Sequence, residues 1–272
     1  MSPRRRRRGQ CVFCSGQDLS HEHVIPRWLR EKLRIQGSVQ EHLEFGPPRK
    51  WNTLALVFSE VCVKCNTGWL SRAEDRARPV LEPMLFGDCA ISLNAMQQAK
   101  LAKWAVKTSL LIALKKSGNK PTGWVPSRSM SWLCQNPDSD EPPPGTYVWL
   151  GCLNTESMIV SYMQSGVLFD DDREPIGHVG MFSVGCVLFQ VFCVEPGAAE
   201  YSEDRDGYFV PQDLRAGLVS IWPSKMVVHW PPVARFTGSS LRSLAERNRQ
   251  GLGLSINGAA GSASYQSWPS FN

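Results

Sequence analysis

Two Cys-x-x-Cys pairs constrain the fold of this chain more than any other feature. They are Cys11-Val-Phe-Cys14 and Cys62-Val-Lys-Cys65, with 47 residues between Cys14 and Cys62. Each pair suits a turn whose two thiolates point at one ion, and two pairs complete a closed tetrahedral site. A redox dithiol is the alternative, but that motif occurs singly and near a βαβ pattern, which is missing here. The pattern therefore predicts one structural zinc bound by all four cysteines.

The remaining cysteines and the N-terminus bear on the cellular compartment. No apolar stretch follows Arg4–Arg8, which argues against a secretory signal, and no run of apolar residues is long enough to span a bilayer. We therefore expect a cytoplasmic protein without disulfides, because cytosolic thiols stay reduced. Five cysteines lack partner spacing and are predicted to be buried thiols: Cys89, Cys134, Cys152, Cys186 and Cys193.

Charge and composition divide the chain into four parts. Residues 1–80 carry 15 Lys and Arg against 8 Asp and Glu, so the whole excess of positive charge lies in the first third. Such a concentration suits a phosphate backbone, although basic runs are often only solvated tails. We predict a flexible basic arm (1–10) whose Arg4, Arg5, Arg6, Arg7 and Arg8 bind nucleic acid. A zinc-binding unit (11–86), an α+β unit of unknown partner (90–232) and a helix with a Gly/Ala/Ser-rich tail (233–272) follow.

Local patterns predict the elements of these units. Short helices are expected at 27–34 and at 67–77, the second ending before Pro79, with a strand at 54–61 between them. Strand-like segments rich in Val, Ile and aromatic residues cover 146–153, 158–163, 180–194 and 218–230, separated by loops at 138–145 and 170–174. Their order predicts an antiparallel sheet, and a last helix is expected at 235–250.

The strongest single element is a helix at 95–116. Asn94 and Gln97 have the spacing of a capping box, and Gly118 lies just beyond the predicted end. Lys100, Lys103 and Lys107 share one face. We interpret this lysine stripe as the solvated side of an amphipathic helix, with contact to a phosphate backbone as the alternative.

Between and after the cysteine pairs lie Ser20-His21-Glu22-His23-Val24-Ile25-Pro26 and Asn66-Thr67-Gly68-Trp69. A first Cys pair, a Glu-His-apolar-apolar-Pro step and a second Cys pair followed by Asn resemble the zinc-stapled subset of the HNH endonuclease family. The resemblance covers residues 11–86. It implies a treble-clef, ββα-metal HNH unit in that range. With the helix and the antiparallel sheet that local patterns predict for the following residues, the expected fold class is α+β.

The resemblance also implies roles for individual residues. His23 would be the general base, and Glu22 and Asn66 would hold a catalytic Mg, Mn or similar divalent ion for hydrolysis of DNA. Imidazole titrates near neutral pH, and a hard cation prefers oxygen ligands, so the residue types fit these roles. The central Asn of the family pattern has only Asn52 as a nearby candidate.

Several alternatives remain open at this stage. On an extended strand His21 and His23 would share a face that Glu22 opposes, which would make the two imidazoles co-ligands. Glu74 and Asp75 could add a carboxylate, although a solvated helix face is the simpler interpretation. A non-catalytic zinc module, a nuclease active only inside a larger assembly, and RNA or a protein partner bound through 90–232 are the competing functions.

Overall fold

The computed structural model describes residues 9–33, 38–42, 49–52, 57–114, 127–154, 163–169, 175–194, 216–224, 226–241, 243–244, 265–267 and 270–271. Residues 1–8 of the predicted arm (1–10), residues 158–162 of the predicted strand at 158–163, the loop at 170–174 and most of the tail therefore lie outside the described residues. The described helices and strands confirm an α+β protein. No described helix combines the length and the apolar character that crossing a membrane requires.

The N-terminal elements form a strand pair followed by helices. Strands β1 (Leu19–His23) and β4 (Val57–Cys62) pair antiparallel, and helix α1 (Arg27–Lys32) follows β1. From β4 the chain leads without a gap into α2 (Val63–Cys65), the wider π-type turns of η2 (Asn66–Leu70) and α3 (Ser71–Leu81), then a short 3₁₀ turn at Glu82–Met84. The predicted strand at 54–61 and the short helix at 27–34 thus appear with slightly shifted ends.

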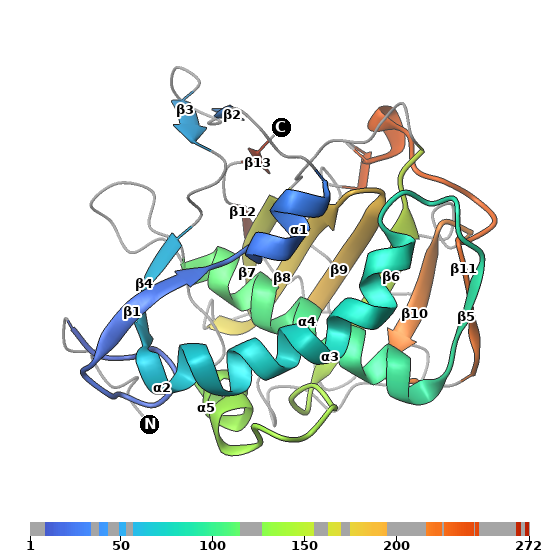
Figure 1. The fold of residues 1–272 in the computed structure, drawn as a ribbon. Coiled ribbons are helices and arrows are strands. Elements are labelled where there is room, and N and C mark those ends of the chain that lie inside the picture. The colour runs from blue at the N-terminus through green and yellow to red at the C-terminus, as the bar shows by residue number, and fades with distance from the viewer. Residues whose placement is uncertain are drawn as a thin grey trace.

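A nine-stranded antiparallel sheet forms the centre of the molecule (Figure 1). Its order is β10-β6-β9-β8-β7-β13-β2-β3, and β12 pairs with β7. The C-terminal members are β6 (Thr146–Cys152), β7 (Met163–Phe169), β8 (Pro175–Val184), β9 (Val187–Val194), β10 (Leu218–Trp222), β12 (Tyr265–Ser267) and β13 (Ser270–Phe271). Two early strands, β2 (Ser38–His42) and β3 (Arg49–Asn52), join through β13, so part of the N-terminal segment completes the sheet.

Helix α4 (Ala95–Leu114) lies across this sheet and under α3 (Figure 1). The capping box is confirmed: Gln97 N donates to Asn94 Oδ1 at 3.0 Å and Asn94 N donates to Gln97 Oε1 at 2.9 Å. Every side chain from Leu101 to Ala113 is buried. Because α3 covers one side and the sheet the other, α4 belongs to one continuous set of buried side chains that extends from Cys11 to Leu244.

The solvated lysine stripe is the clearest error of the sequence analysis. Lys103 is only 4% exposed and Lys107 is 0% exposed, whereas Lys100 is partly buried. Sequence periodicity treats a lysine as a surface residue, but both ammonium groups find hydrogen-bond acceptors on other elements. Lys103 Nζ donates to Asn136 O at 2.9 Å and also to Ser139 O.

Other boundaries differ because tertiary packing outweighs local signals. α3 continues through Pro79 to bury Val80 and Leu81. The predicted strand at 180–194 is two strands, β8 and β9, because Gly185 turns the chain with a positive φ of 57°. The one at 218–230 is β10 and a separate β11 (Val228–Trp230), which pairs with β5 (Ile91–Leu93). Helix α5 (Ser127–Gln135) was not predicted.

Candidate functional site

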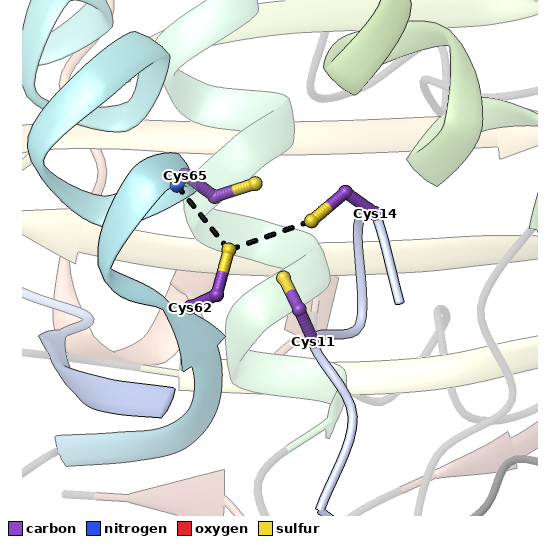
Figure 2. A group of neighbouring side chains, drawn as sticks. All are labelled: Cys11, Cys14, Cys62 and Cys65. Atoms are coloured by element: carbon purple, nitrogen blue, oxygen red, sulfur yellow. Dashed lines mark hydrogen bonds between the residues drawn. The ribbon is translucent and has the colours of Figure 1, made fainter. Parts of the chain in front are cut away.

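The four predicted zinc ligands meet at the start of the helical segment. Cys11 and Cys14 lie in the turn before β1, Cys62 ends β4 and Cys65 ends α2. All four sulfur atoms lie within 4.8 Å of one another, and Figure 2 shows them around a common space. A tetrahedral zinc with bonds of about 2.3 Å would hold its sulfurs about 3.8 Å apart. The cluster can therefore hold a metal such as zinc with little movement.

The chain around the cysteines is folded tightly enough to fix this geometry. Cys11 N donates to Gly16 O at 2.7 Å, and Cys65 N donates to Cys62 Sγ at 3.4 Å. A Cβ at Gly16 would lie 3.3 Å from Cys14 Sγ, so the turn favours glycine there. The hydrogen bond between the two thiols lowers the pKa of Cys11 and raises the pKa of Cys65, so this pair shares a proton when no metal is bound. Zinc binds the thiolate form of cysteine.

The His21-Glu22-His23 triplet alternates across β1 as a strand requires. His21 and His23 are exposed, whereas Glu22 is 5% exposed and points to the other face. A β-bulge lies between Ser20 and Glu22, opposite Ser59 and Glu60. His21 Nδ1 and Ser59 Oγ form a hydrogen bond of 3.1 Å. His21 is therefore a surface residue.

The surroundings of His23 change the pKa of its imidazole. Partial burial, and next the positive charge of Arg30, lower the pKa of His23 below its ordinary value of 6.5. Glu74 opposes this shift and His21 adds to it. The neutral imidazole, which can accept a proton, is therefore the prevalent form at pH 7.

Asn66 connects the helical segment to β1. Its Nδ2 donates to Ser20 Oγ at 2.9 Å and to His21 O at 3.2 Å. Asn66 is also the first residue of η2, where the helix widens before Gly68 departs from helical geometry. π-type turns of this kind are rare and occur often at functional sites.

Glu22 has a partner that sequence analysis missed. Lys107 Nζ on α4 donates to Glu22 Oε1 at 3.1 Å and to Glu74 Oε1 on α3 at 2.5 Å. Burial alone would lower the pKa of Lys107, but the two carboxylates outweigh burial and raise it. Burial raises the pKa of Glu74, an effect that Lys107 opposes. Glu74 is thus part of a buried ion cluster instead of the solvated face expected for it, while Asp75 is exposed.

The other predicted residues lie elsewhere. Asn52 ends β3 in the nine-stranded sheet, whereas His23 belongs to the separate β1–β4 pair. Arg4–Arg8 lie outside the described residues. Among the described residues, the four cysteines form the one group of three or more His, Cys, Asp or Glu side chains whose ligand atoms converge.

The remaining cysteines only partly fit the expectation of burial. Cys152, Cys186 and Cys193 are buried in or beside the sheet, but Cys134 is half-buried and Cys89 is exposed. Cys89 lies in the irregular segment between α3 and β5. This segment is not a strand of a sheet, so the burial that is usual for strand side chains is not expected there. None of the described cysteines forms a disulfide.

Comparisons with protein-family models, with curated proteins and with solved structures gave no match for this chain.

Proposed function

We propose that the protein is a metal-dependent endonuclease of the HNH type that hydrolyses phosphodiester bonds in DNA. The observation that carries the proposal is the ββα arrangement of β1, β4 and the helical segment that starts with α2. In that arrangement the cysteine cluster joins the turn before β1 to the helix, and the Asn66 side chain reaches back to His21 O on β1. Two segments 46 residues apart in the sequence are thereby held in contact.

The proposed roles follow from the side chains present. His23, exposed at the end of β1, would accept the proton of the attacking water. Glu22 and Asn66 would hold the divalent ion, and both offer the oxygen ligands that Mg²⁺ and Mn²⁺ prefer. The Asn66 hydrogen bonds use Nδ2, which leaves Oδ1 as the atom that would bind the ion. When bound, the ion would stabilise the negative charge that develops on the phosphate and the leaving oxygen.

The charge of the chain supports a polyanionic substrate. Residues 1–80 hold the entire positive excess, and five of these charges are the consecutive Arg4–Arg8. Contacts of this kind position a protein on a phosphate backbone without reading its sequence. Cleavage would leave 5′-phosphate and 3′-hydroxyl ends, and RNA is the alternative substrate.

A second candidate is a zinc-stapled recognition module without catalysis. The observation that favours it is the burial of Glu22 and its ion pair with Lys107, because a ligand of a hydrated ion usually lies on an open face. Under this second function, the β1–β4 pair would contact nucleic acid or protein, or would join a larger assembly, and no divalent ion would be needed.

Cleavage of supercoiled plasmid by the full-length protein with Mg²⁺ or Mn²⁺ separates the two functions. We expect His23→Ala to lower the single-turnover rate by about 10²–10⁴-fold, because it removes proton abstraction. Glu22→Gln and Asn66→Ala should instead raise the metal concentration needed for half-maximal cleavage, with partial rescue by excess metal. All three variants should retain zinc, since the cysteines are unchanged.

His21→Ala is the matched control, because it removes a second exposed imidazole from the same face of β1. It should cut at the wild-type rate. A slow His21→Ala beside a normal His23→Ala would show that the two histidines have been assigned in the wrong order. DNA binding without metal-dependent cleavage by the wild type would favour the recognition module.

A further inference from the structure

Lys107 is a fully buried ammonium group that joins three elements. It projects from α4, and its Nζ contacts Oε1 of Glu22 on β1 and Oε1 of Glu74 on α3. The side chain of Lys107 is 0% exposed, and those of Glu22 and Glu74 are 6% and 20% exposed. Each ion in such a cluster loses its hydration, which costs free energy. The presence of the cluster is therefore weak evidence that it stabilises the fold, and a role in function can be considered.

Stability does not by itself require this cluster. Well-packed apolar side chains of similar volume often stabilise a protein as well as, or better than, a buried ion pair does. The neighbours of Lys107 on α4 include the buried apolar residues Val106 and Leu110 as well as the buried polar residues Thr108 and Ser109. An unbranched apolar side chain such as methionine has nearly the volume of lysine and would fit the position. What lysine adds over an apolar side chain is orientation: its ammonium group holds the carboxylates of Glu22 and Glu74 in defined positions.

The two oxygens of Glu22 are not equivalent in this structure. Lys107 contacts Oε1, and among the described residues no hydrogen bond ends on Oε2. Both contacts of Lys107 approach Oε1 atoms, so the ammonium occupies the position between Glu22 and Glu74 where a cation would otherwise bridge two carboxylates.

We propose that Lys107 is a positioning residue of the nuclease site: its ammonium excludes the divalent ion from the space between Glu22 and Glu74 and directs it to Oε2 of Glu22. This inference rests on the proposed function, because it takes Glu22 as an ion ligand. Under this proposal, α4 contributes a residue to the site on β1, although α4 itself packs on the sheet. The segment after residue 90 then contributes more than a separate binding surface.

The test compares Lys107→Met with Lys103→Met in the full-length protein. Lys103 is the matched control, because it lies one turn earlier on the same helix, is nearly as buried, and contacts loop carbonyls instead of Glu22. Two quantities are measured: the Mn²⁺ dissociation constant, from electron paramagnetic resonance of free Mn²⁺, and the single-turnover rate constant for plasmid cleavage at saturating Mn²⁺. Zinc content and thermal unfolding report on the fold.

Lys107→Met should bind Mn²⁺ as tightly as the wild type or more tightly, since two carboxylates then face the ion without a competing charge. The rate constant at saturating Mn²⁺ should nevertheless fall by about a hundredfold, the usual effect of a misplaced reacting group. Adding Glu74→Gln to Lys107→Met should recover part of the rate, because the alternative bridging position loses a ligand. Lys103→Met should leave both quantities unchanged.

A wild-type rate for Lys107→Met, or a rate restored by excess Mn²⁺ after weakened binding, would overturn the inference. If Lys107→Met does not fold, Lys107→Arg replaces it. Arginine keeps the charge but not the size of the ammonium, so normal unfolding with a slowed rate supports positioning, whereas a wild-type rate overturns it.

The same measurements separate this inference from the proposed function. If the wild type binds Mn²⁺ in a way that Glu22→Gln abolishes but does not cut DNA or RNA, the nuclease function is wrong. The Mn²⁺ affinities then decide about Lys107 alone: equal or tighter binding by Lys107→Met supports the inference, and weaker binding overturns it. Absence of any Glu22-dependent Mn²⁺ binding overturns the inference.

Discussion

The contact between Gly180 and Ser109 shows how closely α4 lies on the sheet. Ser109 Oγ and His178 Nε2 form a buried hydrogen bond of 2.8 Å, and Gly180 lies on β8 beside this pair. A Cβ at Gly180 would be 1.9 Å from Ser109 Oγ and 2.9 Å from His178 Nε2. There is no room for a methyl group unless the helix moves or the hydrogen bond breaks.

Gly180→Ala should therefore destabilise the protein, by about 1–3 kcal/mol or more in the free energy of unfolding. Denaturation in guanidinium chloride, followed by tryptophan fluorescence, would measure the change. The matched control is Gly238→Ala, because nothing lies within 4 Å of a Cβ built at Gly238. Equal midpoints for the two variants would contradict this view of the helix–sheet contact.

Single residues differ in how much of their setting the sequence reveals. The cysteine cluster was predictable because two Cys-x-x-Cys pairs supply the four ligands of a tetrahedral zinc site in many different folds. The surroundings of Lys107 were not, since its partners Glu22 and Glu74 come from positions 85 and 33 residues away. A lysine on one face of a predicted helix is expected to be exposed to solvent, because the sequence does not reveal acceptors on distant elements.

At the scale of elements, the cysteine cluster joins the turn before β1 to the end of β4 and to α2. Phe13, within the first Cys pair, packs edge-on against Trp69 of η2 at a centroid distance of 4.8 Å. Val12 N donates to Glu60 O and Val63 N donates to Asp18 O, each at 2.8 Å. A bound zinc would add to these contacts the one covalent-strength link between the turn and the helix.

Cys62→Ser should abolish zinc binding and loosen the β1–β4 pair, because structural zinc contributes roughly 10 kcal/mol or more to folding such a unit. Elemental analysis would give the zinc content, and hydrogen exchange would show lost protection in β1, β4 and α2. Cys89→Ser, an exposed cysteine outside the cluster, is the control and should keep one zinc per chain. Full protection in zinc-free Cys62→Ser would show that the turn holds without metal.

The elements themselves were predictable where the signal is local and complete. The helix at 95–114 has its capping box inside the sequence window that predicts it. The ends of α3 and of the strands were less predictable. Pro79 normally ends a helix, but α3 continues through it because the residues that follow are buried in the core. Gly185 divides one strand-like segment into two strands, and a single glycine in the sequence does not show this turn. β2 and β3 join the main sheet through β13, more than 200 residues away, which no local pattern indicates.

At the scale of the whole molecule, the segment 11–86 does not close its own core. Cys186 N donates to Leu85 O at 2.9 Å, and a Cβ at Gly185 would lie 2.2 Å from Leu85 O. Arg76 donates to Asp138 O at 2.8 Å, and the carboxylates of Glu22 and Glu74 meet Lys107. Each of these partners comes after residue 100.

We therefore expect a fragment of residues 1–86 to lack cooperative folding even with one equivalent of zinc. Helix α3 packs against α4, so without α4 the fragment would expose buried side chains of α3, and Glu22 and Glu74 would lose their common cation. Calorimetry should show a single transition for the full chain and none for the fragment, while the fragment's cysteines still bind zinc or cobalt. A sharp transition in the zinc-loaded fragment would instead mean that the first unit is an independent domain. Lys107 would then stabilise a contact between two domains, because each could fold before the ammonium reaches the carboxylates.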